Sequence, residues 1–189
     1  LKQLPSKSQI PSESVLFYDS ILQKKPFFRA WKKGFKYQLA LKAGEDLKSV
    51  EVFSSVLKKL SQLDLPQTTE LTFVAVGGGS VGDFVGFLSS VFLRGRPLIL
   101  IPSTWLSAVD SAHGGKNGIN LLKQKNQVGT FHSAKKIFIV KQLLKEQPKA
   151  RLTEALGEVI KISIINNSSA FSKLEKANEK IDENFIFKI

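Results

Sequence analysis

Short apolar runs recur along the first three quarters of the chain and alternate with segments of helical periodicity. The runs at 71–76 and 97–101 are apolar almost throughout, which is typical of parallel strands covered on both faces. The predicted strands lie at 15–18, 37–41, 71–76, 97–101 and 136–140. The predicted helices between them lie at 24–36, 44–63 and 81–93. This alternation predicts a Rossmann-like, doubly wound, mostly parallel α/β sheet.

The pattern changes near residue 148, where strands give way to helices alone, predicted at 152–165 and 170–179. The charge balance changes at the same place, from a basic excess to equal numbers of acidic and basic residues. We therefore expect three parts: a polar tail at 1–14, an α/β domain at 15–147, and the first helices of an incomplete all-helical domain at 148–189.

Composition excludes several kinds of site. The 189 residues include no cysteine and two histidines, so the chain holds no thiolate nucleophile and no zinc site made of three histidines. The apolar stretch at 97–102 is too short to span a bilayer, and no signal peptide is visible. We expect a soluble, cytoplasmic protein with no membrane partner.

The net charge of +12 is concentrated before residue 150. A basic excess favours an anionic partner, either a phosphorylated small molecule or nucleic acid. Six basic residues interleave with aromatic residues at 24–36, as a nucleic-acid site would require. The same spacing describes the solvated face of a helix, and we favour that interpretation and expect no nucleic-acid partner.

Three glycines follow the clearest strand and open the next predicted helix. Gly77, Gly79 and Gly82 have the spacing of the dinucleotide fingerprint, in which glycine lets the backbone approach a pyrophosphate at a helix N-terminus. A tight turn packed against the sheet would also explain them. The next strand ends at Ser103 and Thr104, with no acidic residue for the ribose hydroxyls, so a dinucleotide would have to be held differently.

Two later segments, 102–116 and 123–129, are dense in glycine, hydroxyl and amide side chains. Lys116 follows two glycines and is suited to present an ammonium group to a phosphate or carboxylate. Glu158 and Lys161 share one face of a predicted helix at i,i+3 spacing, which alone would indicate only a surface ion pair.

Taken in order, these segments resemble one enzyme family. The matching segments are Ala-Gly-Glu-Asp-Leu-Lys at 43–48, Gly-Gly-Gly-Ser-Val-Gly-Asp at 77–83, Phe-Leu-Arg-Gly at 92–95, Pro-Ser-Thr at 102–104, Asp-Ser-Ala-His-Gly-Gly-Lys at 110–116, Lys-Asn-Gln-Val-Gly at 125–129 and Gly-Glu-Val-Ile-Lys at 157–161. Over about residues 15–175 the chain resembles the 3-dehydroquinate synthases of the sugar phosphate cyclase superfamily.

The resemblance implies an NAD site and part of a substrate and metal site. The residues implied for NAD are Asp19, Glu45, Lys48, Gly78, Gly79, Ser80, Val81, Gly82, Asp83, Ser103, Thr104, Lys116 and Lys125. Those implied for the chemistry and the substrate are Arg94, Asp110, Lys116, Asn126 and Lys161. Glu158 is similar to the first ligand of the family's divalent metal, zinc or cobalt, and Arg94 to an arginine that reaches across a homodimer.

The implied activity converts 3-deoxy-arabino-heptulosonate 7-phosphate, a phosphorylated sugar acid, to 3-dehydroquinate with loss of phosphate. The family's two metal-binding histidines should follow residue 189, so this chain is expected to be inactive alone. Ser103, His113, Asn117 and Glu146 depart from the family pattern. Another sugar phosphate cyclase and a nucleotide-binding module without catalysis therefore remain alternatives, and a basic nucleic-acid-binding module comes last.

Overall fold

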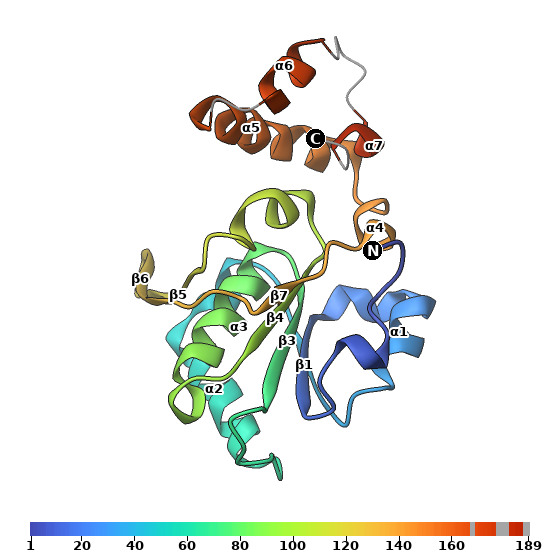
Figure 1. Ribbon diagram of the computed structural model, residues 1–189. Helices are drawn as coiled ribbons and strands as arrows, with labels where there is room; N and C mark the ends of the chain where they lie inside the picture. Colours follow the sequence, from blue (N-terminus) through green and yellow to red (C-terminus); the bar gives the residue numbers. More distant parts are fainter. Residues whose placement is uncertain (167–168, 177–181, 187–189) are drawn as a thin grey trace.

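A computed structural model describes residues 1–166, 169–176 and 182–186 and contains a five-stranded parallel sheet with helices on both faces. The strand order is β2-β1-β3-β4-β7 (Figure 1). The strands are β1 Ser14–Asp19, β2 Tyr37–Leu41, β3 Thr72–Gly77, β4 Leu98–Pro102 and β7 Lys136–Ile137. The predicted fold class, a mostly parallel Rossmann-like α/β domain, is confirmed.

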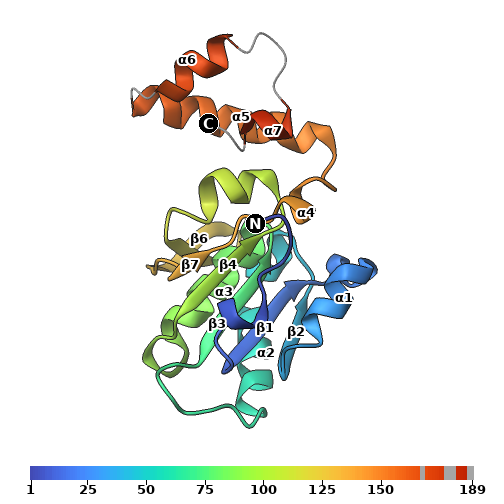
Figure 2. The ribbon, with the colours of Figure 1, turned by 45° about the vertical axis from the view of Figure 1, so that its right-hand side comes forward.

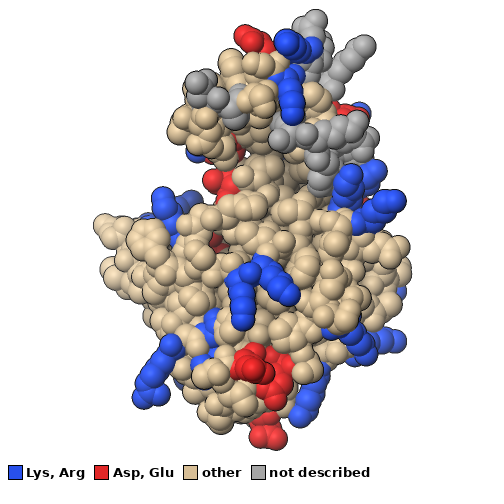
Figure 3. Space-filling view, in the orientation of Figure 1, with Lys and Arg blue, Asp and Glu red and all other residues tan. Residues whose placement is uncertain are grey.

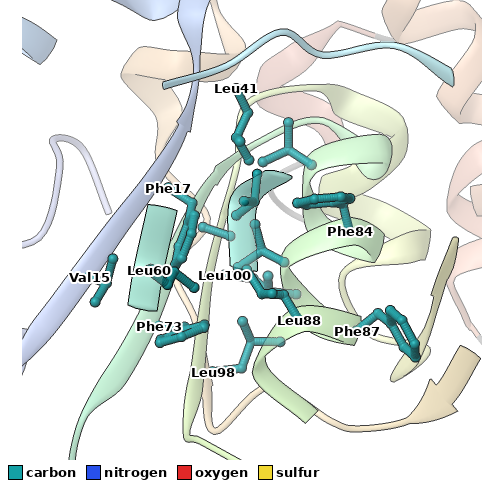
Figure 4. Close-up of a cluster of buried hydrophobic side chains, with 14 of the residues drawn as sticks. Val15, Phe17, Leu41, Leu60, Phe73, Phe84, Phe87, Leu88, Leu98 and Leu100 are labelled. Atoms are coloured by element: carbon teal, nitrogen blue, oxygen red, sulfur yellow. The ribbon is translucent and has the colours of Figure 1, made fainter. Parts of the chain in front are cut away.

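The helices α2 and α3 cover one face of the sheet, and α1 covers the other with residues 1–14 (Figures 1 and 2). Their bounds are α1 Pro26–Lys32, α2 Val50–Ser61 and α3 Gly79–Val91. Successive side chains of β3 alternate between these layers. Phe73 packs with the α2 and α3 side, where Figure 4 shows it beside Phe17, whereas Val74 packs with Phe28 of α1. Because both faces are covered, both sets of strand positions are apolar.

In the described residues, four further helices follow the sheet. They are α4 Lys141–Leu144, α5 Lys149–Ile165, α6 Ser169–Lys176 and α7 Glu183–Ile186. The helices α5, α6 and α7 form a separate layer above the carboxyl ends of the strands (Figure 1). Part of the helix predicted at 170–179 lies outside the described residues. In the part of the chain that the structure describes, no helix is long and apolar enough to cross a membrane.

The predicted helix over 44–63 proved to be two elements. A 3-10 turn at Glu45–Lys48 precedes α2, and Ser49 separates them in an extended conformation. The Ser49 hydroxyl accepts a hydrogen bond from the Val52 amide at 3.2 Å, so Ser49 is the N-cap of α2. The last strand is also shorter than predicted, since β7 pairs with β4 only over Lys136–Ile137.

An antiparallel hairpin that the sequence did not predict spans residues 116–131 and includes the polar segment 123–129. Its strands are β5 Lys116–Leu121 and β6 Gln124–Phe131. A Cβ on Gly129 would lie 2.3 Å from the Asn117 carbonyl oxygen, and one on Gly118 would lie 2.9 Å from that of Val128. The two glycines are therefore required by the close approach of the two strands.

Residues 1–14, expected to be a tail, contact the α1 side of the domain. The Trp31 indole Nε1 donates a hydrogen bond to the Pro5 carbonyl oxygen at 2.7 Å. Ile10 is buried among Leu16, Phe28 and other residues of the α1 face. This segment completes the hydrophobic layer beneath α1.

Candidate active site

The candidate site lies at the carboxyl edge of the sheet, where the chain changes direction. From β1 the chain moves outward to β2 and then returns to the other side of β1 to form β3. In open parallel sheets, ligands bind in the crevice that such a switch point creates. The strands around it end at Asp19, Gly77 and Pro102, so the residues that follow them face this crevice.

The glycine-rich turn between β3 and α3 leaves room at the N-terminus of the helix. Gly78 is the N-cap, and its carbonyl oxygen accepts from the Gly82 amide at 3.0 Å. A Cβ on Gly78 would lie 3.0 Å from Thr104 Cγ2, and one on Gly79 would lie 3.2 Å from Ser111 Oγ. A Cβ on Gly82 would meet no atom within 4 Å. The first helical amides therefore face a shallow cradle suited to an anion such as a pyrophosphate.

The Lys48 side chain joins three separate segments beside this turn. It is buried, with its Nζ 2.9 Å from Asp83 Oδ2 on α3, and it also donates to Asn126 Oδ1 on β6. Burial raises the pKa of the Asp83 carboxyl, and the hydrogen bond from Lys48 partly opposes this effect. The cluster connects the turn before α2, the first turn of α3 and the hairpin.

A second polar chain ties the same turn to the hairpin. Asn120 Nδ2 donates to Glu45 Oε1 at 2.8 Å, and the Asn126 amide donates to Asn120 Oδ1 at 2.9 Å. Lys125 Nζ lies 3.7 Å from Glu45 Oε2. The hydrogen bond from Asn120 lowers the pKa of Glu45, with help from the charges of Lys48 and Lys125. Glu45 is therefore held as a carboxylate.

A pocket of about 710 Å³ opens between the hairpin, the start of α3 and α5. Its polar side chains include Asp83, Asp110, Lys116, Asn126 and Lys161, all residues that the sequence pointed to. Figure 3 shows the narrow waist between the helical layer and the sheet-containing body, with acidic side chains inside it. A pocket with two ammonium groups, two carboxylates and three side-chain amides can bind a small polar anion and exchange protons with it.

Glu158 and Lys161 form an ion pair on α5 at the border of this pocket. The hydrogen bond with Glu158 raises the pKa of Lys161, and the charge of Asp110 adds to the effect. Within residues 1–166, 169–176 and 182–186, no three histidine or acidic side chains form a group that could hold a metal ion. Glu158 is thus a single candidate ligand, and these residues do not fit a complete metal site.

A neighbouring cavity of about 480 Å³ continues the crevice beyond the ends of β1 and β4. Asp19, Ser103, Thr104 and Glu146 line it. Asp19 Oδ1 accepts from the Ile21 amide at 3.1 Å, and Glu146 pairs with Lys25. Of the predicted cofactor residues, Asp19, Ser103 and Thr104 line this cavity, and Asp83 and Lys116 line the larger one.

Comparison with known proteins identifies the family. The model of the 3-dehydroquinate synthase N-terminal domain matches residues 38–154, which is more than half of the chain. The chain belongs to the 3-dehydroquinate synthase family. The 3-dehydroquinate synthase of Methylacidiphilum infernorum is 36% identical over 141 residues, which cover 75% of this chain and 39% of that protein. The chain thus spans about two fifths of the length of such curated relatives.

Solved structures of other sugar phosphate cyclases share the fold at lower identity. The 2-epi-5-epi-valiolone synthase of Streptomyces hygroscopicus, with NAD+ and Zn2+ bound, aligns with a TM-score of 0.73 and 25% identity over 84% of this chain and 46% of that one. A 2-deoxy-scyllo-inosose synthase complexed with carbaglucose-6-phosphate, NAD+ and Co2+ aligns at 0.70 and 27%, over 82% and 44%.

One predicted residue of this 3-dehydroquinate synthase family member lies apart from the site. Arg94 is exposed on the 3-10 turn Phe92–Arg94 that follows α3, roughly 18 Å along the helix axis from the glycine-rich turn. His113 and His132 contact backbone oxygens, of Ala108 at 2.9 Å and of Arg96 at 3.0 Å. Neither histidine is part of a metal group in the described part of the chain.

The structure also adds site residues that the sequence did not single out. Asn120 connects Glu45 to Asn126, and Ser111 and Thr130 line the larger pocket. Ser111 belongs to the polar segment 102–116, whereas Asn120 and Thr130 lie outside both polar segments, so no pattern in the sequence pointed to these two residues. Asn117, a departure from the family pattern, donates to the carbonyl oxygens of Gly115 at 2.9 Å and His132 at 2.8 Å.

Proposed function

We propose that this chain is the NAD-binding part of a 3-dehydroquinate synthase. The observation that carries the proposal is the cradle at the start of α3, where Gly82 faces open space beside the Lys48–Asp83 pair. This cradle lies at the switch point of the sheet and within the residues that the family model matches. The bound NAD+ of the valiolone and inosose synthases supports the same cofactor here.

Three segments of the chain each contact a different part of the cofactor. The amides of Gly79 and Ser80 take the pyrophosphate, since the first amides of a helix have no acceptor within it and its N-terminus attracts negative charge. Asp83 and Glu45 supply carboxylate oxygens that accept hydrogen bonds from ribose hydroxyls, with Lys48 holding Asp83 in place. Ser103, Thr104 and Asp19 line the second cavity, which takes the remaining part of the dinucleotide. NAD supplies a hydride acceptor that returns the hydride later in the same cycle.

The larger pocket holds the substrate, which we propose is 3-deoxy-arabino-heptulosonate 7-phosphate. Lys116 and Lys161 neutralise the charges of its carboxylate and phosphate, and Asn126 donates to an oxygen of the sugar acid. Asp110 lies in the same pocket, within reach of a substrate hydroxyl as a proton acceptor. Phosphate leaves by elimination, and closure of the ring gives 3-dehydroquinate.

Arg94 acts on a second copy of the chain. It is exposed at the far end of α3 and does not line either cavity of its own chain. A homodimer that places this turn beside the partner's pocket would add a guanidinium group for the phosphate. Among the described residues Glu158 is a single candidate metal ligand, so we expect complete activity to need further ligands.

Cofactor binding is tested by calorimetric titration of the chain with NAD. Gly82→Val places its Cβ in the open space at the cradle, where a Cβ meets no atom within 4 Å, so it should abolish NAD binding with little effect on the fold. Gly157→Val is the matched control, because a Cβ there also meets nothing within 4 Å and Gly157 lies on α5. Equal NAD affinity of the Gly82→Val variant and the unsubstituted chain would contradict the proposed cofactor site.

The substrate class is tested on the NAD-loaded chain. The heptulosonate phosphate carries a carboxylate that carbaglucose-6-phosphate lacks, so it should bind more tightly to a pocket with two lysines. Lys161→Gln should reduce this preference, because it removes one of the two ammonium groups of the pocket. Tighter binding of carbaglucose-6-phosphate would instead favour another sugar phosphate cyclase. NAD binding with no affinity for either phosphate would favour a nucleotide-binding module.

A further inference from the structure

A cavity of about 500 Å³ lies at the opposite edge of the sheet from the candidate active site. Pro11 and Ser12, just before β1, and Phe35, just before β2, contribute to its wall, so it sits at the amino ends of these strands. The end of α1 and the segment 5–10 close the other sides. It shares no residue with the two cavities of the candidate active site, and its volume is that of a small-molecule site.

One wall of this cavity is the outer end of a row of aromatic rings in tilted and edge-to-face contact. Ring centroids lie 5.3 Å apart for Tyr18 and Phe28, 5.7 Å for Phe28 and Trp31, and 4.9 Å for Trp31 and Phe35. Phe28 is fully buried, whereas Trp31 and Phe35 remain partly exposed. The hydrogen bond from the Trp31 indole to Pro5 fixes the orientation of the ring. This row of rings thus ends on a rigid aromatic surface against which another planar ring could pack, tilted or edge-to-face.

The charge of the cavity is positive. Lys7 and Lys33 line it, and no acidic side chain does. A Cβ on Gly34 would lie 3.1 Å from Lys7 Cε, so the Lys7 stem crosses the wall at Gly34. Across the described ranges, no hydrogen bond or ion pair engages the ammonium group of either lysine. An anionic group at the mouth of the cavity would therefore meet two unpaired positive charges.

We propose that this cavity is a second ligand site, which takes a small planar aromatic carboxylate. The ring packs against Trp31 and the edge-to-face neighbour Phe35, and the carboxylate lies between Lys7 and Lys33. Apolar side chains, among them Ile10, enclose the rest of the ring. The site does not depend on the proposed function, because it uses none of the residues assigned to NAD or to the phosphorylated substrate.

The test uses 2-naphthoate as the probe and the indole N–H signals of the isotopically labelled chain in NMR spectra. The chain has two tryptophans, and Trp105 is buried beneath the helical layer, so its signal serves as an internal reference. We expect a saturable shift of the Trp31 signal with 2-naphthoate and weaker binding of the neutral 2-naphthylmethanol. Absence of a shift at Trp31 with 2-naphthoate at millimolar concentration would overturn the proposal.

Two variants separate the contributions of charge and shape. Lys7→Gln/Lys33→Gln should weaken 2-naphthoate binding about fivefold, the effect of two partly exposed ion pairs, and leave 2-naphthylmethanol unchanged. Lys123→Gln/Lys135→Gln, which alters two exposed lysines outside this cavity, should change neither. Ala30→Phe places a ring in the cavity from an exposed position and should abolish binding of both. Unchanged 2-naphthoate affinity in the first variant or in Ala30→Phe would contradict the assigned site.

Discussion

Replacing Lys48 with methionine should destabilise the fold. The Lys48 ammonium group joins the turn before α2, the first turn of α3 and the hairpin, and the substitution removes it. The Lys48 side chain is 5% exposed and that of Asp83 25%, so the change leaves a largely buried carboxylate without its ammonium partner. Removing one member of a buried ion pair costs about 3–5 kcal/mol. Because Asp83 keeps some contact with water and methionine retains the apolar stem, we expect a loss of about 3 kcal/mol at neutral pH. For a chain of this size that corresponds to a fall in Tm of about 6–12 °C.

Urea denaturation followed by circular dichroism measures this loss, since urea does not screen charges as guanidinium does. Lys42→Met is the control, because Lys42 is exposed just beyond β2 and should tolerate the same substitution within about 0.5 kcal/mol. The double variant Lys48→Met/Asp83→Asn removes both charges and should recover about 2 kcal/mol of the loss. A Lys48→Met variant as stable as Lys42→Met, or a double variant less stable than Lys48→Met, would refute the reasoning.

Two further predictions concern the same part of the molecule. Because burial raises the pKa of Asp83 above its ordinary value of 3.8, the folded chain holds this proton more tightly than the unfolded chain does. The free energy of unfolding, relative to that of Asp83→Asn, should therefore fall as the pH rises from 3.8 through the raised pKa. Urea titrations in which this relative free energy rose with pH would contradict the prediction. Gly86→Ala places a Cβ 1.8 Å from Asn117 Oδ1 and should cost about 1–3 kcal/mol in the same assay. Asn117→Ala should recover part of that cost, and strictly additive effects would argue against the contact.

The sheet was predictable because its signal is local. Buried parallel strands such as β3 and β4 require apolar residues on both faces, and those runs are visible in the sequence. The hairpin was not predictable, since β6 is exposed along nearly its whole length and carries no alternating apolar pattern. The break at Ser49 was missed because a serine cap does not interrupt the 3.6-residue spacing that continues through it.

The sequence predicted which residues belong to the candidate site but not how they lie relative to one another. Motif resemblance named Lys48, Asp83 and Asn126, yet their contacts join positions 35 and 78 residues apart, which only the folded chain reveals. Asn120 carries no motif and is identified by its bonds to Glu45 and Asn126 alone. The roles of these residues toward NAD and substrate stay predictions, because a family pattern specifies the residue type and not the ligand that it touches in this chain.

A crystal structure of the chain grown with NAD would show directly whether the cofactor binds at the start of α3. We expect the pyrophosphate against the amides of Gly79 and Ser80, with Asp83 at a ribose and the rest of the dinucleotide extending along the carboxyl edge of the sheet toward Thr104. NAD found only elsewhere, for example at the amino edge near Trp31, or no bound NAD at saturating concentration, would contradict it.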